Sequence, residues 1–228
     1  MSDDGNKRPA DVQVVKPTTV NIVDGPNPLL ADFFNVDEYD VAFEKFQGGC
    51  SEKMRRLVFD RGHAVAALLY DPERGKVILV EQFRLPTYGR LPRHKDKPLG
   101  KLGSGWILET AAGMIKPSET PIGCLIREVE EETGYKVKDA VEIANFYPSP
   151  GGSTERIQLY LAEVSEIDRS NHDNIRNIGD EKSGTYENIK VHHIDQYEFF
   201  RLLESRELED AKLIIAGYFL KDRVTRSD

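Results

Sequence analysis

Cysteine is scarce in this sequence, since only Cys50 and Cys124 occur among its 228 residues. Two cysteines are too few for a disulfide framework, and their spacing does not match a zinc or iron–sulfur site. We therefore expect two reduced thiols. We exclude the classes of protein whose folds depend on disulfide bonds, zinc ligands or iron–sulfur clusters.

Long hydrophobic runs are also absent. No segment approaches the roughly 18 consecutive apolar residues that a membrane-spanning helix requires. The first ten residues, MSDDGNKRPA, are polar and contain no apolar stretch of the kind found in secretory signals. We expect a cytoplasmic protein without a membrane partner, in which residues 1–10 form a disordered tail.

Positively charged residues are fewer than negatively charged ones. The chain has 31 lysine and arginine residues against 39 aspartate and glutamate residues, which gives a formal net charge of -8. Such a charge repels polyanions unless a basic patch or bound cations invert it locally. Nucleic acid is therefore not expected as a general partner, whereas a small anionic ligand fits if a divalent metal ion lies between it and the protein.

The N-terminal quarter has the pattern of a small β-strand unit. Residues 12–23 and 39–46 are predicted to be extended, and Asp24–Pro28 between them is dense in turn-forming residues. A chain of this length suits one main domain plus a smaller accessory unit. We expect the N-terminal unit to cover residues 11–60 and the main domain to cover residues 61–228.

The main domain has strands with helices at intervals, which indicates a mixed α/β fold. Two apolar runs at residues 63–70 and 76–84 flank a turn that contains Pro and Gly, and they predict a β-hairpin. Trp106 is expected to lie in the core. Further strands are expected at 106–112, 137–147, 156–164 and 188–194, and further helices at 195–205 and 209–223.

A helix with clear ends is expected at residues 120–133. Thr120 is a suitable N-cap, Pro121 suits the first helical position and Gly134 is a suitable C-terminal stop. At about 100° per residue, this helix has two adjacent stripes, one apolar and expected to pack, the other acidic. The apolar stripe contains Ile122, Leu125, Ile126 and Val129, and the acidic stripe contains Glu128, Glu131 and Glu132.

The acidic stripe has two explanations. The usual explanation for a charged helix stripe is a solvated surface. However, Glu128 lies three and four residues before Glu131 and Glu132, and like charges at these spacings destabilise a helix by roughly 0.2–0.5 kcal/mol per pair. Clustered carboxylates are the ligands that hard cations such as Mg²⁺ prefer, so we favour a metal site.

The same segment resembles the signature of the Nudix hydrolase family. That signature is Gly, five residues, Glu, seven residues, then Arg-Glu-apolar-any-Glu-Glu-any-Gly-apolar, and the sequence matches every specified position. At residue frequencies of about 5–7%, a chance match has a probability on the order of one in ten million. The matching residues are Gly113, Glu119, Arg127, Glu128, Val129, Glu131, Glu132, Gly134 and Tyr135.

The resemblance implies a fold, a cofactor and a reaction. The fold would be an α/β/α sandwich with a mixed sheet, in which Glu128, Glu131, Glu132 and the backbone carbonyl of Ala112 hold the metal. Mg²⁺ is the expected metal and Mn²⁺ is the alternative. The reaction would be hydrolysis of a diphosphate by a metal-activated water. The residues expected to form the scaffold of the site are Gly113, Glu119 and Arg127.

Two flanking segments, Val80–Arg84 and Ser149–Glu155, narrow the resemblance to ADP-ribose pyrophosphatases and related nucleoside diphosphate sugar hydrolases. In that subfamily the N-terminal unit forms a swapped homodimer, so a homodimer is expected here. Glu155 is the expected general base, with a solvent-exposed loop acid as the alternative. Arg84 is expected to contact phosphate rather than to form only a surface ion pair. Glu109 is expected to contact ribose or a metal.

Three functions fit these patterns. Hydrolysis of ADP-ribose to AMP and ribose 5-phosphate is the leading expectation, and hydrolysis of GDP-mannose or another nucleotide sugar keeps the same chemistry. A non-hydrolytic nucleotide-sugar sensor is the third, although its usual sign is a damaged signature. Residues 86–105 form a basic segment that is either a mobile surface loop or a lid or dimer-contact loop that adds positive charge near the diphosphate.

Overall fold

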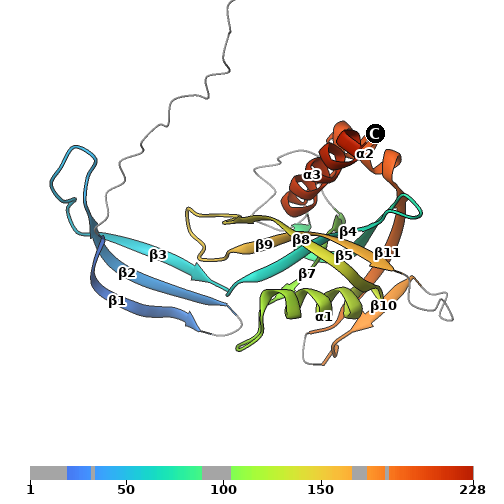
Figure 1. The fold of residues 1–228 in the computed structure, drawn as a ribbon. Coiled ribbons are helices and arrows are strands. Elements are labelled where there is room, and N and C mark those ends of the chain that lie inside the picture. Colours follow the sequence, from blue (N-terminus) through green and yellow to red (C-terminus); the bar gives the residue numbers. More distant parts are fainter. Residues whose placement is uncertain (1–19, 32–33, 89–103, 166–173, 183–184, 228) are drawn as a thin grey trace, which may run out of the picture. The chain divides into compact units, whose positions relative to one another are not determined.

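The computed structural model describes residues 20–31, 34–88, 104–165, 174–182 and 185–227 (Figure 1). The tail expected at residues 1–10 and most of the basic segment at 86–105 lie outside the described residues. The chain divides into two compact units, residues 1–61 with 151–153 and residues 62–150 with 154–228. We call them unit 1 and unit 2.

Unit 1 contains an antiparallel sheet with the strand order β1-β2-β3, formed by Val20–Ala31, Asn35–Phe43 and Met54–Asp60. The turn expected at Asp24–Pro28 is wrong, because β1 continues through this segment. The turn-forming residues instead produce three irregularities in the pairing of β1 with β2. An edge strand tolerates such residues because one of its sides makes no ladder hydrogen bonds.

Unit 2 is built around a mixed eight-stranded sheet. Its order is β10-β11-β5-β4-β9-β8, with β6 paired to β5 and β7 paired to β4. β4 is parallel to β9 and antiparallel to β5 and β7. The strands are β4 (Ala64–Asp71), β5 (Lys76–Tyr88), β6 (Ser104–Glu109), β7 (Ala111–Met114), β8 (Lys136–Phe146), β9 (Ile157–Ser165), β10 (Ile175–Ile178) and β11 (Glu187–Asp195).

Helices cover both faces of this sheet, with α1 (Pro121–Thr133) on one face and α2 (Gln196–Ser205) and α3 (Ala211–Ser227) on the other (Figure 1). β4 supplies core residues to both sides: Val65 and Leu69 pack in the cluster under α1, and Ala66 and Leu68 pack in the cluster under α2 and α3. Burial on both faces explains why β4 is an almost continuous apolar run. The expected α/β/α sandwich with a mixed sheet is confirmed.

The hairpin of β4 and β5 is confirmed, but the single strand expected at residues 106–112 is wrong. This segment forms two strands, β6 and β7, which pair with different neighbours on either side of Thr110. β10 was not predicted, since its four residues are too few to establish an alternating pattern. Within the described ranges, no helix is long and apolar enough to cross a membrane.

Candidate active site

Helix α1 begins and ends where the sequence predicts. The Thr120 hydroxyl accepts a hydrogen bond from the Gly123 N–H at 3.2 Å, and Pro121 is the first helical residue. At the other end, Gly134 adopts a left-handed φ of 73° and its N–H donates to the Glu130 carbonyl at 2.9 Å. These two caps fix where the acidic stripe of the helix begins and ends.

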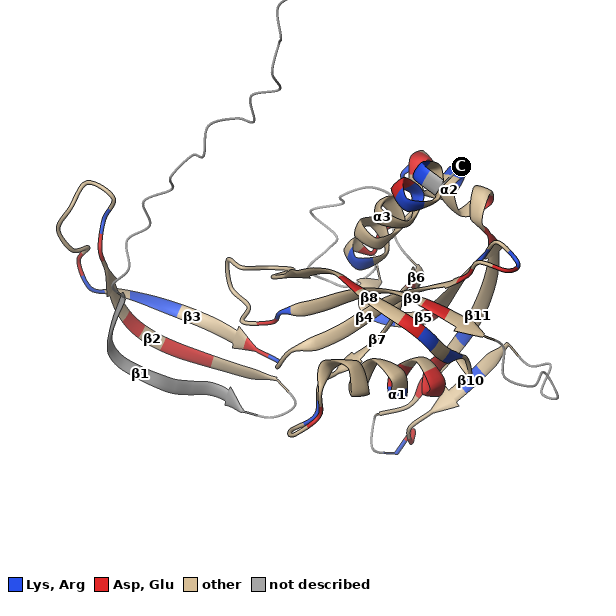
Figure 2. Cartoon of the chain, viewed as in Figure 1, with Lys and Arg blue, Asp and Glu red and all other residues tan. Residues whose placement is uncertain are grey.

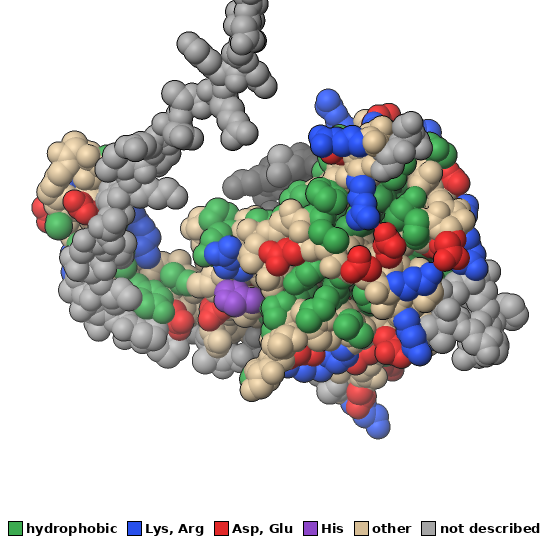
Figure 3. Space-filling view, viewed as in Figure 1, with side chains coloured by type: hydrophobic (Ala, Val, Ile, Leu, Met, Phe, Trp, Pro, Cys, Tyr) green, Lys and Arg blue, Asp and Glu red, His purple; other side chains and the backbone are tan. Residues whose placement is uncertain are grey.

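The buried face of α1 is rotated relative to the expected apolar stripe. Leu125 and Val129 are buried as expected, but Ile122 and Ile126 are 42% and 47% exposed, so their expected packing is wrong. At about 100° per residue, the buried positions centre on the direction of Glu132. Glu132 and the mostly buried Glu128 therefore face the sheet, whereas Glu131 stays half-exposed. Hydrophobic side chains reach the surface of unit 2 among charged ones, as Figure 3 shows.

Acidic residues gather towards the C-terminal end of α1, where the helix is red in Figure 2. The three acids of the stripe lie at different depths. Glu132 is 3% exposed, and its carboxylate accepts the Ala112 N–H at 3.1 Å. Glu128 is mostly buried and lies 2.6 Å from an Arg127 nitrogen, whereas the half-exposed Glu131 lies 3.3 Å from the same nitrogen. The helix thus presents a graded row of carboxylates beside the backbone of Ala112.

Arg127 and Glu119 form a bidentate pair that holds the loop before α1 against the helix. The Arg127 Nε and one terminal nitrogen donate to the two Glu119 oxygens at 2.9 and 3.0 Å. Glu119 also accepts the Lys116 N–H at 3.0 Å. These hydrogen bonds, with that of Arg127 foremost, lower the pKa of Glu119 to about 2, and the Glu119 hydrogen bond raises the pKa of Arg127.

Two glycines of the signature are required for steric reasons. A Cβ atom on Gly113 would overlap the Glu128 carboxylate, and a Cβ atom on Gly134 would overlap the Arg176 guanidinium. Arg176, on β10, donates to the Thr133 carbonyl at 3.4 Å, which places a cation at the C-terminal end of α1. Gly134 is required for a second reason, because its φ is one that other residues adopt with strain.

The donor set of this cluster fits a hard divalent cation. Burial raises the pKa of Glu132 well above its ordinary value and also raises that of Glu128, so both carboxylates carry a charge that the protein alone compensates incompletely. Clustered carboxylate oxygens are the ligands that Mg²⁺ prefers. Across the described residues, no three His, Cys, Asp or Glu side chains are already gathered as metal ligands. The acids are instead hydrogen-bonded to Arg127 and Ala112.

Glu109 lies at the centre of a second polar cluster. One Glu109 oxygen accepts hydrogen bonds from Arg84 Nε at 2.7 Å and from Gln82 Nε2 at 3.1 Å, and the other lies 3.4 Å from Lys212 Nζ. Burial opposes the charge of Arg84, but the charge and hydrogen bond of Glu109 outweigh it and raise the pKa of Arg84. Glu187 lies 3.7 Å from a terminal nitrogen of Arg84, whereas Glu109 contacts its Nε. The structure therefore brings Arg84 and Glu109 together.

Gln82, Lys212 and Glu187 belong to this cluster but were not predicted. Gln82 lies within the segment Val80–Arg84, where strand alternation places it on the same side as Arg84, so the sequence contained a signal. Lys212 is 103 residues from Glu109 in sequence, and Glu187 is at the first position of β11, so only the fold brings them to the site. The charges of Arg84 and Glu187 both act on Glu132, which links the two clusters.

Glu155 lies half-buried in the segment between β8 and β9, one residue before Arg156. The Arg156 N–H donates to His63 Nδ1 at 3.2 Å, and the Arg156 carbonyl accepts the Ala64 N–H at 3.0 Å. The backbone on the C-terminal side of Glu155 is therefore fixed to the start of β4. The role of Glu155 as a general base stays a prediction.

A cavity of about 540 Å³ lies next to the Arg84 cluster. The Trp106 ring packs edge-to-face on Phe83, with 5.9 Å between the ring centroids, and it is 45% exposed. The expectation that Trp106 lies in the core is therefore wrong, because its side chain lines an open cavity. The cavity is lined by Gln82, Phe83, Trp106, Tyr186, Glu187 and Asn188.

Comparison with known proteins places this site in a family. The NUDIX domain matches residues 60–214. The chain is 31% identical over 216 residues to the ADP-ribose pyrophosphatase of Escherichia coli strain K12, covering 91% of this chain and 95% of that protein. It is 29% identical to the ADP-ribose pyrophosphatase of Haemophilus influenzae, covering 94% and 92%. It is also 30% identical to the GDP-mannose pyrophosphatase of Yersinia pestis, covering 82% and 84%.

A solved structure supports the fold. The crystal structure of an ADP compounds hydrolase superposes with a TM-score of 0.59 at 18% identity, covering 93% of this chain and 96% of that chain. Its fold matches the mixed sheet between α1 and the pair α2 and α3. With the signature on α1 intact and relatives that match along most of their length, the chain belongs to the NUDIX family and is a Nudix pyrophosphatase.

Proposed function

We propose that the chain hydrolyses ADP-ribose to AMP and ribose 5-phosphate with Mg²⁺ as its cofactor. The observation that carries the proposal is the intact carboxylate row on α1 in a chain whose ADP-ribose pyrophosphatase relatives match over 91% and 94% of its length. Mn²⁺ is the alternative metal. A nucleotide sugar is a small anion, which agrees with the acidic balance of the chain once a cation lies between them.

The carboxylate row supplies the metal ligands in this proposal. Glu128, Glu131, Glu132 and the Ala112 carbonyl would hold Mg²⁺, which would neutralise the diphosphate and lower the pKa of a water. Burial of Glu132 and Glu128 strengthens their interaction with a cation, because low local dielectric increases electrostatic attraction. The Arg127–Glu119 pair holds the loop before α1 against the helix.

Arg84 and Glu109 bind the substrate in this proposal. Glu109 holds Arg84 Nε at 2.7 Å, so the terminal nitrogens of the guanidinium, one of which lies 3.7 Å from Glu187, can turn towards phosphate oxygens. Glu109 then orients the phosphate-binding group, in addition to the contact with ribose or metal that we expect of it. Lys212 and Gln82 support Glu109 from its other sides.

Glu155 takes the proton from the attacking water. Because the carboxylates of α1 are committed to the cation, a base from another element is required. The change Glu155→Gln is expected to lower kcat by about 10²-fold or more while KM stays within about 3-fold, since the base acts on the chemical step. An unchanged kcat would assign the role to another acid.

The second candidate is hydrolysis of GDP-mannose, which the 30% identity to the Yersinia pestis enzyme favours. The two are separated by kcat/KM values for ADP-ribose, ADP-glucose, GDP-mannose and UDP-glucose in excess Mg²⁺, each with an EDTA control. A preference for ADP-ribose supports the proposal, and a preference for GDP-mannose replaces it. Turnover of no substrate, with binding of at least one, would make the chain a nucleotide-sugar sensor.

The remaining assignments concern the whole protein. We propose a cytoplasmic homodimer that assembles through an N-terminal unit at residues 11–60, with the hydrolase domain at residues 61–228. Light scattering tests the assembly: a dimer mass supports it, and a monomer mass at micromolar concentration contradicts it. Deleting residues 11–60 is expected to abolish the dimer.

A further inference from the structure

His63 connects two loops of unit 2. It lies one residue before β4, and its ring Nδ1 accepts the Arg156 N–H at 3.2 Å. Its carbonyl accepts the Ile115 N–H at 3.0 Å. Ile115 directly follows β7 and leads into the loop of Glu119, whereas Arg156 directly precedes β9. One residue thus links the loop before the metal-binding helix to the loop that carries Glu155.

The hydrogen bond from Arg156 fixes the peptide group of Glu155. The N–H of Arg156 belongs to the peptide plane whose carbonyl is that of Glu155, so holding this N–H restricts the backbone of Glu155 directly. The Arg156 carbonyl accepts the Ala64 N–H at 3.0 Å, which is the first ladder bond between the parallel strands β4 and β9. Glu155 therefore lies directly before the first residue that takes part in this ladder.

An imidazole takes a position that a backbone carbonyl occupies in a regular parallel ladder. Gly62, one residue before His63, has a left-handed φ of 81°, so the chain turns here and does not continue the strand. The acceptor for the Arg156 N–H is therefore the His63 side chain and not a backbone carbonyl. A side-chain acceptor can be altered by substitution without changing the backbone, which makes the contact testable.

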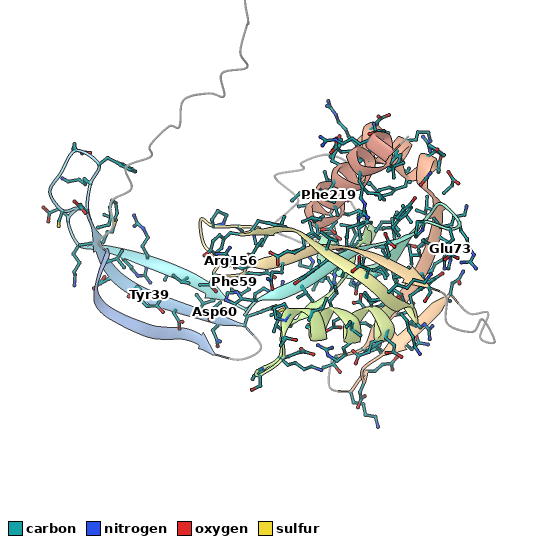
Figure 4. The ribbon with its side chains drawn as sticks, in the orientation of Figure 1. Tyr39, Phe59, Asp60, Glu73, Arg156 and Phe219 are labelled. Carbon is teal, nitrogen blue, oxygen red and sulfur yellow. The ribbon has the colours of Figure 1, made fainter. Side chains whose placement is uncertain are left out.

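The side chain of Arg156, which is labelled in Figure 4, also anchors this point of the chain. Its Nε donates to Asn145 Oδ1 at 2.9 Å, and its guanidinium lies over the Tyr147 ring, 4.6 Å from the centroid. Both partners are at the end of β8 or just beyond it. Arg156 is thus a fixed point, and His63 determines how the peptide leading from Glu155 meets it.

We propose that His63 is a positioning residue, which sets the orientation of Glu155 relative to the metal-binding helix by holding the Glu155–Arg156 peptide through Nδ1 and Ile115 through its carbonyl. This inference rests on the proposed function, because it assigns to His63 an effect on the general base. In this inference His63 acts on the reaction only through Glu155. A misplacement of about 1 Å in a catalytic group costs on the order of 10²-fold in rate.

The test compares two substitutions of His63. His63→Leu removes the acceptor at similar size and is expected to lower kcat about 10- to 100-fold with KM within about 3-fold. His63→Asn keeps an acceptor near the position of Nδ1 and is expected to recover kcat to within about 5-fold of wild type. His192→Leu is the matched control, since His192 pairs with Glu81 on β5 and is expected to leave kcat unchanged.

A double-mutant cycle with Glu155→Gln separates positioning from general support of the fold. If His63 acts through Glu155, His63→Leu changes kcat of the Glu155→Gln protein by less than about 3-fold. Multiplicative losses in the cycle would overturn the inference, as would equal losses in His63→Leu and His63→Asn. Amide exchange at Arg156, measured at the same time, is expected to rise at least about 10-fold only in His63→Leu.

The two proposals fail in different ways. If the wild type turns over a nucleotide sugar and Glu155→Gln has the same kcat, the inference about His63 is overturned and the hydrolase assignment stands. A wild type that turns over no nucleotide sugar overturns both. If Glu155→Gln greatly lowers kcat but the losses of kcat in the double-mutant cycle multiply, only the role of His63 is overturned.

Discussion

The Glu128 carboxylate occupies the space above Gly113 where any other residue would place its Cβ atom. The first and the fourth specified positions of the signature are Gly113 and Glu128. Together they meet one steric requirement, because the backbone of β7 at Gly113 must approach the helix closely enough for the Glu128 carboxylate to lie against it. This contact leads to the first prediction.

Gly113→Ala is expected to displace the Glu128 carboxylate, lowering turnover by about 10²-fold. The overlap is expected to destabilise the fold by about 1–3 kcal/mol, as overpacking does. The double variant Gly113→Ala/Glu128→Ala is the control: thermal unfolding should show Tm restored, because the overlap is gone, while activity stays lost. A Gly113→Ala protein with wild-type kcat would contradict the contact.

Glu132→Gln is expected to separate stability from activity. Removing a ligand costs several kcal/mol of transition-state stabilisation, about 10³-fold in kcat. In EDTA the same change is expected to raise Tm, because burial opposes the charge of Glu132 and the amide oxygen still accepts the Ala112 N–H. Differential scanning calorimetry with and without Mg²⁺ checks both, and a lower Tm in EDTA would argue against the charge cost.

The Glu119–Arg127 pair is expected to make the fold acid-sensitive. The pKa of Glu119 is about 2 in the folded chain and about 4.3 in unfolded chains. A lowered pKa stabilises the fold above the unfolded value, and this contribution is lost as the pH falls towards the folded value. The stability difference between wild type and Glu119→Gln should therefore shrink between about pH 4.5 and pH 2.

Urea unfolding at several pH values measures this difference. Glu130→Gln serves as the control, because Glu130 is an exposed glutamate on the same helix. Its stability difference from wild type should stay small throughout. A Glu119→Gln difference that is constant from pH 6 to pH 2 would show that the pair does not hold the loop.

The two cysteines are expected to differ in reactivity. Burial raises the pKa of Cys124 to about 12, whereas Cys50 is exposed in unit 1. The thiolate is the reactive form, so at pH 8 a disulfide reagent should titrate one thiol in the native protein and two in denaturant. Cys50→Ser should abolish the fast reaction. Rapid modification of Cys124 would contradict its burial against Met114 and Arg127.

Thr110→Val is expected to stabilise the fold. The Thr110 hydroxyl is buried between β6 and β7 and, within the described residues, has no hydrogen-bond partner. Replacing an unsatisfied hydroxyl by a methyl group of similar shape should gain about 1 kcal/mol. Chemical denaturation measures the gain. A loss of stability together with a loss of activity would mean that the hydroxyl binds a water of the site.

Features encoded locally were predictable from the sequence. The ends of α1 follow from Thr120, Pro121 and Gly134, whose capping roles depend only on neighbouring residues. The β4–β5 hairpin likewise follows from a short turn between two apolar runs. The signature supplied Glu119 and Arg127 as scaffold residues, and the structure places them at hydrogen-bonding distance from each other.

Features that depend on long-range packing were not predictable. The rotation of α1, which exposes Ile122 and Ile126, depends on how the helix meets the sheet. Lys212 reaches Glu109 only because α3 packs across the sheet. The continuation of β1 through Asp24–Pro28 depends on its position at the edge of the sheet, since an edge strand accepts irregularities that an isolated pattern suggests are turns.

The measurement that tests the central claim most directly is product formation from ADP-ribose by the full chain in excess Mg²⁺, followed before and after EDTA. The account predicts AMP and ribose 5-phosphate in equal amounts, stopped by EDTA and restored by Mg²⁺, with Glu132→Gln inactive under the same conditions. Hydrolysis that persists in EDTA, or an active Glu132→Gln protein, would contradict the assignment of the carboxylate row as the metal-dependent catalytic centre.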